Sequence, residues 1–133
     1  MGASVRPVLE AHQQASKLFR GIQLAAAWDA SEDLLSMPGM NDAALYSDPD
    51  FVEGFAVLAD MRLCFDAYHY HHQNAGLTTL ARAFPEVEIV LDHLGTPLGV
   101  GPYADRREEI YLQWAADIRD LASCTNVSMK LGG

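Results

Sequence analysis

The strongest constraint on the fold is a regular alternation along the chain between stretches of helical periodicity and short β-type runs. Apolar residues at helical spacing predict four helices, over 5–18, 48–59, 77–84 and 105–123. Apolar and aromatic runs between and after them predict four strands, over 19–26, 63–70, 88–93 and 126–131. Alternating units joined by short helix-to-strand connections predict an α/β fold, with four parallel strands and right-handed crossovers.

Local signals support these boundaries. Asp48 followed by Pro49 is typical of an N-cap and a first helical position, and Pro85 is expected to end the third helix. The stretch 29–47 has no steady period and contains Pro38 and Gly39, which predicts a long loop with at most a short helical turn. The continuous apolar run within 88–93 predicts a strand covered on both faces.

Composition excludes several classes of protein. Half of the 133 residues are hydrophobic and a fifth are charged, which is typical of a chain that buries a core. The net charge of −9 argues against a nucleic-acid partner. No apolar run approaches the roughly 18 residues of a membrane span, and no signal peptide opens the chain, so we expect a cytoplasmic protein without a membrane partner. Cys64 and Cys124 lack CxxC spacing and are expected to be free, buried thiols.

Reactive residue types gather where the predicted strands end. Ligands of parallel α/β proteins bind at the carboxyl ends of the strands, because side chains and loops from all strands converge there. The residues at these four ends are Gln23, Trp28 and Asp29, then Asp66 and 69–73, then Asp92 and His93, and finally Lys130. This coincidence predicts a site at that end of the sheet.

Several of these residues have two interpretations. His93 follows an apolar strand and precedes glycine, so its imidazole is either a metal ligand or acid/base group at the rim, or a cap that bonds the turn. A carboxylate at Asp66, inside an apolar strand, is either catalytic or paired with Arg20 or Lys130. Lys130 either holds an oxyanion or neutralises Asp66.

The histidines after the second predicted strand and the arginines before the last helix are less specific. His69 and His71 have HxH spacing, which suits a divalent metal. Solvent-exposed loop histidines are the favoured interpretation of His69 and His72. Arg106 is either part of a solvated helix face or a contact for an anionic substrate.

A series of motifs, in order along nearly the whole chain, is similar to one known family. The motifs are RPVLEAH (6–12), FRGI (19–22), AAWD (26–29), FDAY (65–68), YH (70–71) with Gln73, IVLDHLG (89–95), GPY (101–103) with two arginines (106–107), and Val127 with KLG (130–132). Together they resemble the amidohydrolase-related (amidohydrolase 2) family. Within it, the most similar group is that of metal-dependent TIM-barrel hydrolases that include sugar and dicarboxylate lactonases.

The resemblance implies the central half, about strands 3 to 6, of a (β/α)₈ TIM barrel, with residues 1–133 as one partial domain. It implies hydrolysis of a lactone or a related ester or amide. His93 and Asp66 are the predicted catalytic residues. Substrate contacts are predicted at Tyr70, His71, Gln73 and Lys130. His93 is also the predicted ligand of one divalent metal, zinc or manganese, unless the site is metal-free.

The resemblance also implies missing parts. The family carries a histidine pair on its first strand and a catalytic aspartate after its eighth, and neither segment matches this chain. Gln23 and Leu24 stand where family members often have arginine and histidine. Because a complete barrel needs about 250 residues, we expect this chain to be inactive by itself and to self-associate through open sheet edges.

Two alternatives remain beside the hydrolase interpretation. The first is a non-catalytic half-barrel that self-associates or is completed by another chain. The second is a small flavodoxin-like domain, which is disfavoured because no Gly-rich phosphate loop follows the first predicted strand.

Overall fold

A computed structural model describes residues 2–37 and 42–132, and within them it forms one four-stranded sheet. The strands are β1 (Gly21–Ala25), β2 (Cys64–Tyr68), β3 (Ile89–Leu91) and β4 (Val127–Met129). They lie side by side in sequence order, and each neighbouring pair is parallel. The four predicted parallel strands are therefore confirmed, although each is shorter than predicted.

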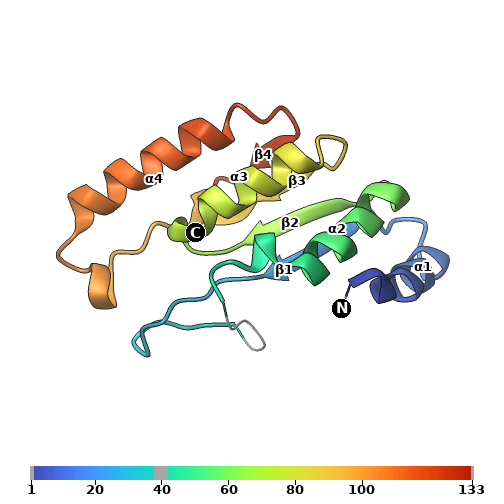
Figure 1. Ribbon diagram of the computed structural model, residues 1–133, viewed down its shortest axis with the longest axis horizontal. Helices are drawn as coiled ribbons and strands as arrows, with labels where there is room; N and C mark the ends of the chain where they lie inside the picture. Colours follow the sequence, from blue (N-terminus) through green and yellow to red (C-terminus); the bar gives the residue numbers. More distant parts are fainter. Residues whose placement is uncertain (1, 38–41, 133) are drawn as a thin grey trace.

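Four helices alternate with these strands, as predicted. They are α1 (Arg6–Ala15), α2 (Pro49–Met61), α3 (Asn74–Ala83) and α4 (Arg107–Leu121). Right-handed crossovers between sequential parallel strands place the connecting helices on one face of the sheet, and Figure 1 shows α2, α3 and α4 in front of the strands. Short 3-10 turns complete the described chain at η1 (Gly2–Val5), η2 (Leu45–Ser47), η3 (His71–Gln73), η4 (Asp92–Gly95) and η5 (Gly101–Tyr103).

The helix boundaries follow from capping chemistry. Asp48 Oδ1 accepts a hydrogen bond from the Phe51 N–H at 2.9 Å, and Pro49 occupies the first turn of α2. Arg62 ends α2 in the left-handed conformation, with φ of 53°. The described parts of the predicted 29–47 loop contain only the short turn η2. The loop residues Pro38 and Gly39 lie outside the described residues.

One face of the sheet, which we call the covered face, carries the core. Phe65, Ala67, Ile89 and Leu91 point toward the helices and are 1% exposed or less. The ring of Phe65 meets that of Phe55 in α2 edge-on, with centroids 5.2 Å apart. Alternate strand residues therefore supply the apolar layer that the helices cover.

The opposite face, which we call the open face, is polar. Gln23, Asp66, Val90 and Ser128 are consecutive partners across the four strands. Gln23 and Ser128 are exposed, and Asp66 and Val90 are half-buried. The prediction that the third strand is covered on both faces is thus wrong for Val90, because no second layer of described residues packs on this side.

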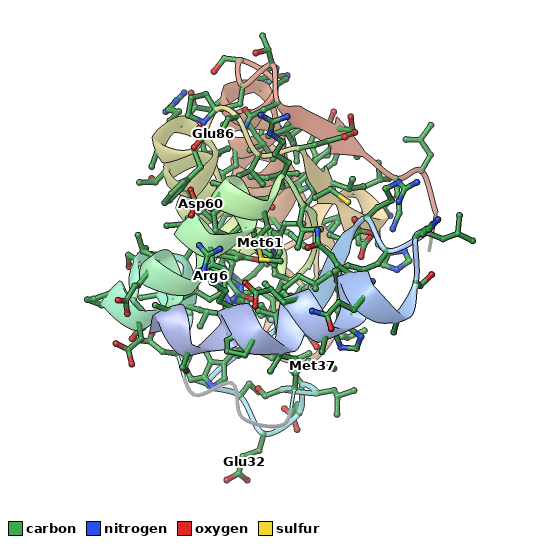
Figure 2. All side chains as sticks on the ribbon, turned by 90° about the vertical axis from the view of Figure 1, so that its right-hand side faces the viewer. Arg6, Glu32, Met37, Asp60, Met61 and Glu86 are labelled. Atoms are coloured by element: carbon green, nitrogen blue, oxygen red, sulfur yellow. The ribbon has the colours of Figure 1, made fainter. Side chains whose placement is uncertain are left out.

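The remaining features of the fold are a surface ion pair between two helices and the two cysteines. Arg6 of α1 pairs with Asp60 of α2 at 2.6 Å on the surface of the helical layer (Figure 2). Cys64 and Cys124 are both free thiols, as predicted, although Cys64 is only half-buried. Within residues 2–37 and 42–132, the helices are too short or too polar to cross a lipid bilayer.

Candidate functional site

Four polar side chains meet on the open face near the carboxyl ends of the strands, and we call them the inner-face cluster. They are Gln23, Asp66, Asp92 and Lys130. The Lys130 ammonium bridges the two carboxylates, 2.5 Å from Asp66 Oδ2 and 3.0 Å from Asp92 Oδ1. Gln23 Nε2 donates to Asp92 Oδ2 at 2.6 Å. The cluster places one cation between two carboxylates.

The burial of Asp92 explains why this network exists. Asp92 is 1% exposed, and a carboxylate so buried needs charge and hydrogen-bond partners. Gln23 of edge strand β1 and Lys130, directly after edge strand β4, supply them. Hydrogen bonding to Asp66 and then to Asp92 raises the pKa of Lys130 above its ordinary value, so its ammonium is charged at neutral pH.

The structure selects among the predicted partners of Asp66. Its carboxylate pairs with Lys130, whereas Arg20 donates to the main-chain oxygens of Lys17 and Phe19. Lys130 therefore neutralises Asp66 in this structure. The sequence placed Gln23 and Asp92 near the predicted strand ends but assigned them no role in the site, and the parallel register that brings them beside Lys130 was the missing signal.

His93 lies at the rim in the turn η4, which begins where β3 ends. Its side chain is exposed, and its ring meets that of Tyr68 edge-on, with centroids 5.6 Å apart. The turn is closed by its main-chain oxygen, which accepts from the Thr96 N–H at 3.0 Å. Its imidazole makes no hydrogen bond with the described residues, so the prediction of a capping side chain is not supported and the ring faces solvent.

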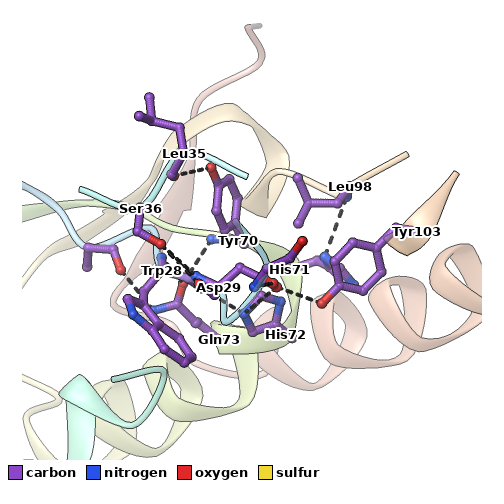
Figure 3. Close-up of polar contacts among 12 residues, drawn as sticks. Trp28, Asp29, Leu35, Ser36, Tyr70, His71, His72, Gln73, Leu98 and Tyr103 are labelled. Atoms are coloured by element: carbon purple, nitrogen blue, oxygen red, sulfur yellow. Dashed lines mark hydrogen bonds and ion pairs between the residues drawn. The ribbon is translucent and has the colours of Figure 1, made fainter. Parts of the chain in front are cut away.

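A second polar group, which we call the rim cluster, lies where loops cross the carboxyl end of the sheet (Figure 3). It consists of Asp29, His71, His72 and Tyr103. The Tyr103 hydroxyl donates to Asp29 Oδ2 at 2.7 Å, and His72 Nε2 lies 3.8 Å from the same oxygen. Burial and then the bond to Asp29 raise the pKa of Tyr103 to about 12. The phenol is therefore protonated at neutral pH.

The side chains predicted to bind substrate at this rim also organise the loops. Gln73 Oε1 accepts from the main-chain N–H groups of Trp28 and Tyr70, and its Nε2 donates to the Ala26 oxygen at 2.9 Å. The Tyr70 hydroxyl donates to the Leu35 oxygen at 2.6 Å. The polar atoms of Tyr70 and Gln73 are thus engaged with the main chain, and their predicted substrate contacts stay predictions.

The histidines of the predicted HxH pair do not converge. His69 is fully buried and is bonded through both ring nitrogens, to Tyr46 and to Asn74. Its assignment as an exposed loop histidine is therefore wrong, because its side chain points into the covered side of the sheet. His71 is 2% exposed, and its Nδ1 accepts a long hydrogen bond of 3.5 Å from the Leu98 N–H. Burial lowers the pKa of each imidazole to about 4.

A groove of about 540 Å³ opens beside the rim cluster. His71, His72 and Tyr103 line it together with the first turns of α4. Arg106 lines it as well, but its guanidinium is held by both carboxylate oxygens of Glu109, at 2.9 and 2.5 Å. The predicted contact between Arg106 and an anionic substrate would therefore compete with an ion pair that already exists.

The described residues do not by themselves form a metal site. Among them, no group of three or more histidine, cysteine, aspartate or glutamate side chains is arranged to hold a metal ion. Asp92 is already occupied by Lys130 and Gln23. His93 is the exposed imidazole that could supply one ligand, and any further ligands would have to come from outside these residues.

Comparison with protein families gives one match that spans nearly the whole chain. The family model of the amidohydrolases matches residues 2–133. The uncharacterized protein y4mH of Sinorhizobium fredii is 30% identical to this chain over 131 residues. That match covers 97% of this chain and 40% of the relative.

Solved structures show the same part of a fold. An amidohydrolase from Burkholderia multivorans with bound zinc superposes with a TM-score of 0.69 at 24% identity, over 97% of this chain and 41% of that protein. Amidohydrolase 2 from Bifidobacterium longum subsp. infantis gives 0.55 at 21% identity, over 93% and 47%. These neighbours are TIM-barrel enzymes, so the predicted part of a barrel is confirmed. The chain spans about 40% of the length of the relatives that it matches.

Proposed function

The chain belongs to the amidohydrolase family, and on that premise we propose that it forms the central part of a hydrolase in which water attacks a carbonyl group. The proposed substrate is a lactone or a related ester or amide. His93 is the proposed acid/base group, because histidine transfers protons near neutral pH and this imidazole is exposed at the rim. A cytoplasmic location belongs to the same proposal.

The inner-face cluster is the observation on which this proposal rests. Attack on a carbonyl creates an oxyanion, and a fixed cation at that position lowers the barrier. The Lys130 ammonium is fixed by Asp66 and Asp92 at the end of the strands where His93 also lies. These carboxylates take two of its three N–H donors, so one donor remains for a substrate oxygen. We therefore assign Lys130 to the substrate oxygen and Asp66 to the orientation of Lys130, which refines the predicted catalytic role of Asp66.

The proposed metal is supported only in part. The Burkholderia neighbour contains zinc, whereas this chain offers His93 as a single prospective ligand. A bound divalent ion would polarise the carbonyl or the water. The proposed role of the chain's own residues, Lys130 toward the oxygen and His93 toward the proton, does not depend on that ion.

We propose that the 133-residue chain does not hydrolyse these substrates by itself. Its open face has no opposing layer of described residues, so a bound carbonyl would remain in water. The electrostatic effect of Lys130 is then weak, because bulk solvent screens it.

The test replaces the matching segment of the 30%-identical Sinorhizobium fredii protein with this chain. The unmodified relative is first screened against sugar lactones, dicarboxylate lactones, esters and amides. A folded chimera should hydrolyse substrates of the class that the relative accepts, and His93→Ala should abolish that turnover. A folded chimera without turnover on that class, or one unaffected by His93→Ala, would disprove the proposal. Turnover by the 133-residue chain alone would disprove only its inactivity.

A second candidate function is a half-barrel that associates with another copy or another chain. The observation in its favour is the position of exposed apolar side chains. Leu18 precedes edge strand β1, and Leu131 follows edge strand β4. They are 81% and 86% exposed, respectively. Apolar side chains flanking open strand edges are typical of surfaces that pair with further strands.

A further inference from the structure

A buried hydrogen-bond network of Tyr46, His69 and Asn74 lies beneath the loop that carries His93. The Tyr46 hydroxyl lies 2.7 Å from His69 Nδ1, and His69 Nε2 lies 2.9 Å from Asn74 Oδ1. Their residues are 3%, 0% and 0% exposed. Tyr46 belongs to η2, whereas His69 follows β2 and Asn74 begins α3. These hydrogen bonds therefore connect three segments that enclose one side of the rim.

The chemistry of the partners fixes the direction of these bonds. The Asn74 carbonyl oxygen can only accept, so His69 Nε2 carries the proton and donates it. His69 Nδ1 is then unprotonated and accepts from the Tyr46 hydroxyl. A neutral imidazole with its proton on Nε2 satisfies both partners. Burial lowers the pKa of His69 to about 4, so the ring is neutral at pH 7.

Asn74 lies directly under the loop of η4. A Cβ built on Gly95 would stand 2.6 Å from Asn74 Oδ1, so main chain and carboxamide are in close contact there. Gly95 has φ of 68°, and His93 and Leu94 have φ of 49° and 58°. Non-glycine residues in the left-handed region are strained by about 1–2 kcal/mol each. Such a loop persists only where its surroundings hold it in place.

Two further contacts hold the loop from other sides. Trp114 Nε1 donates to the Leu94 oxygen at 2.7 Å, and the His71 N–H donates to the Thr96 oxygen at 3.2 Å. The first contact holds Leu94 and the second holds Thr96. Asn74 is the support beneath its centre, and its carboxamide is oriented by His69.

We propose that His69 is a positioning residue that acts through Asn74 and Gly95 to hold the strained loop on which His93 is presented beside Tyr68. The importance of that placement for hydrolysis rests on the proposed function. The placement itself is a property of this chain and is measured without any substrate.

The first measurement is the tautomer of His69 in the unmodified chain. Nitrogen-15 NMR at pH 7 should show Nε2 protonated and Nδ1 unprotonated, with a slowly exchanging Nε2 proton. The opposite tautomer would overturn the proposal, because Nε2 would then carry no proton to donate to Asn74 Oδ1.

The second measurement follows the loop in His69→Leu and His69→Gln. In His69→Leu we expect amide exchange of residues 93–96 to accelerate about tenfold, since the hydrogen bond that orients Asn74 beneath the loop is lost together with the bond to Tyr46. The upfield shift that the Tyr68 ring imposes on the His93 imidazole protons should fall at the same time. His69→Gln keeps an N–H donor for Asn74 and should restore both signals toward their original values.

The matched control is Asn126→Ala. Asn126 Nδ2 donates to the main-chain oxygens of Ala81, Phe84 and Val87 at 3.0–3.2 Å, far along the chain from the His93 loop. It should lower overall stability and leave the Tyr68–His93 shift unchanged. If His69→Leu does not fold, Asn74→Ala provides the test, because it removes the carboxamide beside Gly95 through which His69 is proposed to act. Equal changes at all protected amides, or an unchanged His93 shift in a folded variant, would overturn the positioning role.

Discussion

The two faces of the four-stranded sheet are stabilised by different interactions. On the covered face, Phe65 and Ile89 are 1% and 0% exposed and pack against helices that belong to this chain. On the open face, Asp66 and Lys130 hold each other by an ion pair, with side chains 25% and 50% exposed. The covered face is complete within the described residues, whereas the open face lacks an opposing layer among them.

This difference predicts that the covered face determines the stability of the fold and the open face determines the chemistry of the site. Apolar burial contributes about 25 cal/mol per Å², so the covered face supplies most of the folding free energy. Half-exposed ion pairs contribute about 0–1 kcal/mol. Substitutions on the open face should therefore change the site while the fold survives, and the four predictions below test that separation.

The largest effect is expected for Phe65→Ala. Phe65 is 1% exposed and contacts the rings of Phe51 and Phe55, so its removal should cost about 3–5 kcal/mol of the free energy of unfolding. Its neighbour on the opposite face gives the matched variant, Asp66→Ala, with an expected loss below about 1 kcal/mol. Chemical denaturation of both variants measures the difference. Equal losses would contradict the separation of the two faces.

Acid should weaken the protein through its buried histidines. Burial lowers the pKa of His69 from 6.5 to about 4, so between these values the unfolded chain binds a proton that the folded chain does not. The stabilising contribution of the neutral ring is full above pH 6.5 and is lost as the pH falls toward 4. From pH 7 to 5 we expect a loss of about 2 kcal/mol from this histidine.

Denaturation at a series of pH values checks this slope. His69→Gln should flatten it, and an equally steep slope in the folded variant would contradict this origin. His71 adds a slope of the same sign, because burial also lowers its pKa to about 4. A slope of opposite sign would mean that these rings are charged in the folded protein.

The sequence predicted the covered face well because that face obeys periodicity. Helical spacing and strand alternation depend on burial, and burial by the chain's own helices is a local consequence of βαβ order. The Asp48–Pro49 cap and the end of α3 before Pro85 were predicted from local capping and proline chemistry, which depends only on neighbouring residues. Strand ends were overestimated; the third predicted strand, for example, included Asp92 and His93, which belong to the turn η4.

The candidate site was predicted only in part, because its geometry depends on register. Asp66, Lys130 and His93 were predicted, and the ion pair of the first two was one of two alternatives. Asp92 and Gln23 were not predicted as site residues, since only the parallel register brings them beside Lys130. His69 was misassigned because an imidazole in a polar stretch looks exposed until its partners Tyr46 and Asn74 are placed.

An intermediate effect is expected for Asp92→Asn. The variant keeps the shape of the side chain and removes the charge that faces Lys130 at 3.0 Å. We expect a loss of about 1 kcal/mol, because the buried group retains a hydrogen-bond acceptor for Gln23. Asp120→Asn, in the exposed pair with Arg82, is the control and should cost less than about 0.5 kcal/mol. A larger loss in the control would mean that the inner-face cluster is not the stronger network.

The smallest effect on stability, and the most informative for association, is expected for Leu131→Asp. Leu131 is 86% exposed beside the open edge of β4, so a charge there costs the monomer almost nothing and repels any strand that would pair with the edge. If open edges drive self-association, the unmodified 14.6 kDa chain sediments as a larger species and the variant shifts toward the monomer. Leu35→Asp is the control, because Leu35 is similarly exposed, at 71%, in a loop rather than at an edge. Equal shifts in the two variants would mean that exposed apolar side chains in general, and not the sheet edge, drive association. A monomeric unmodified chain would mean that its sheet edges do not drive self-association.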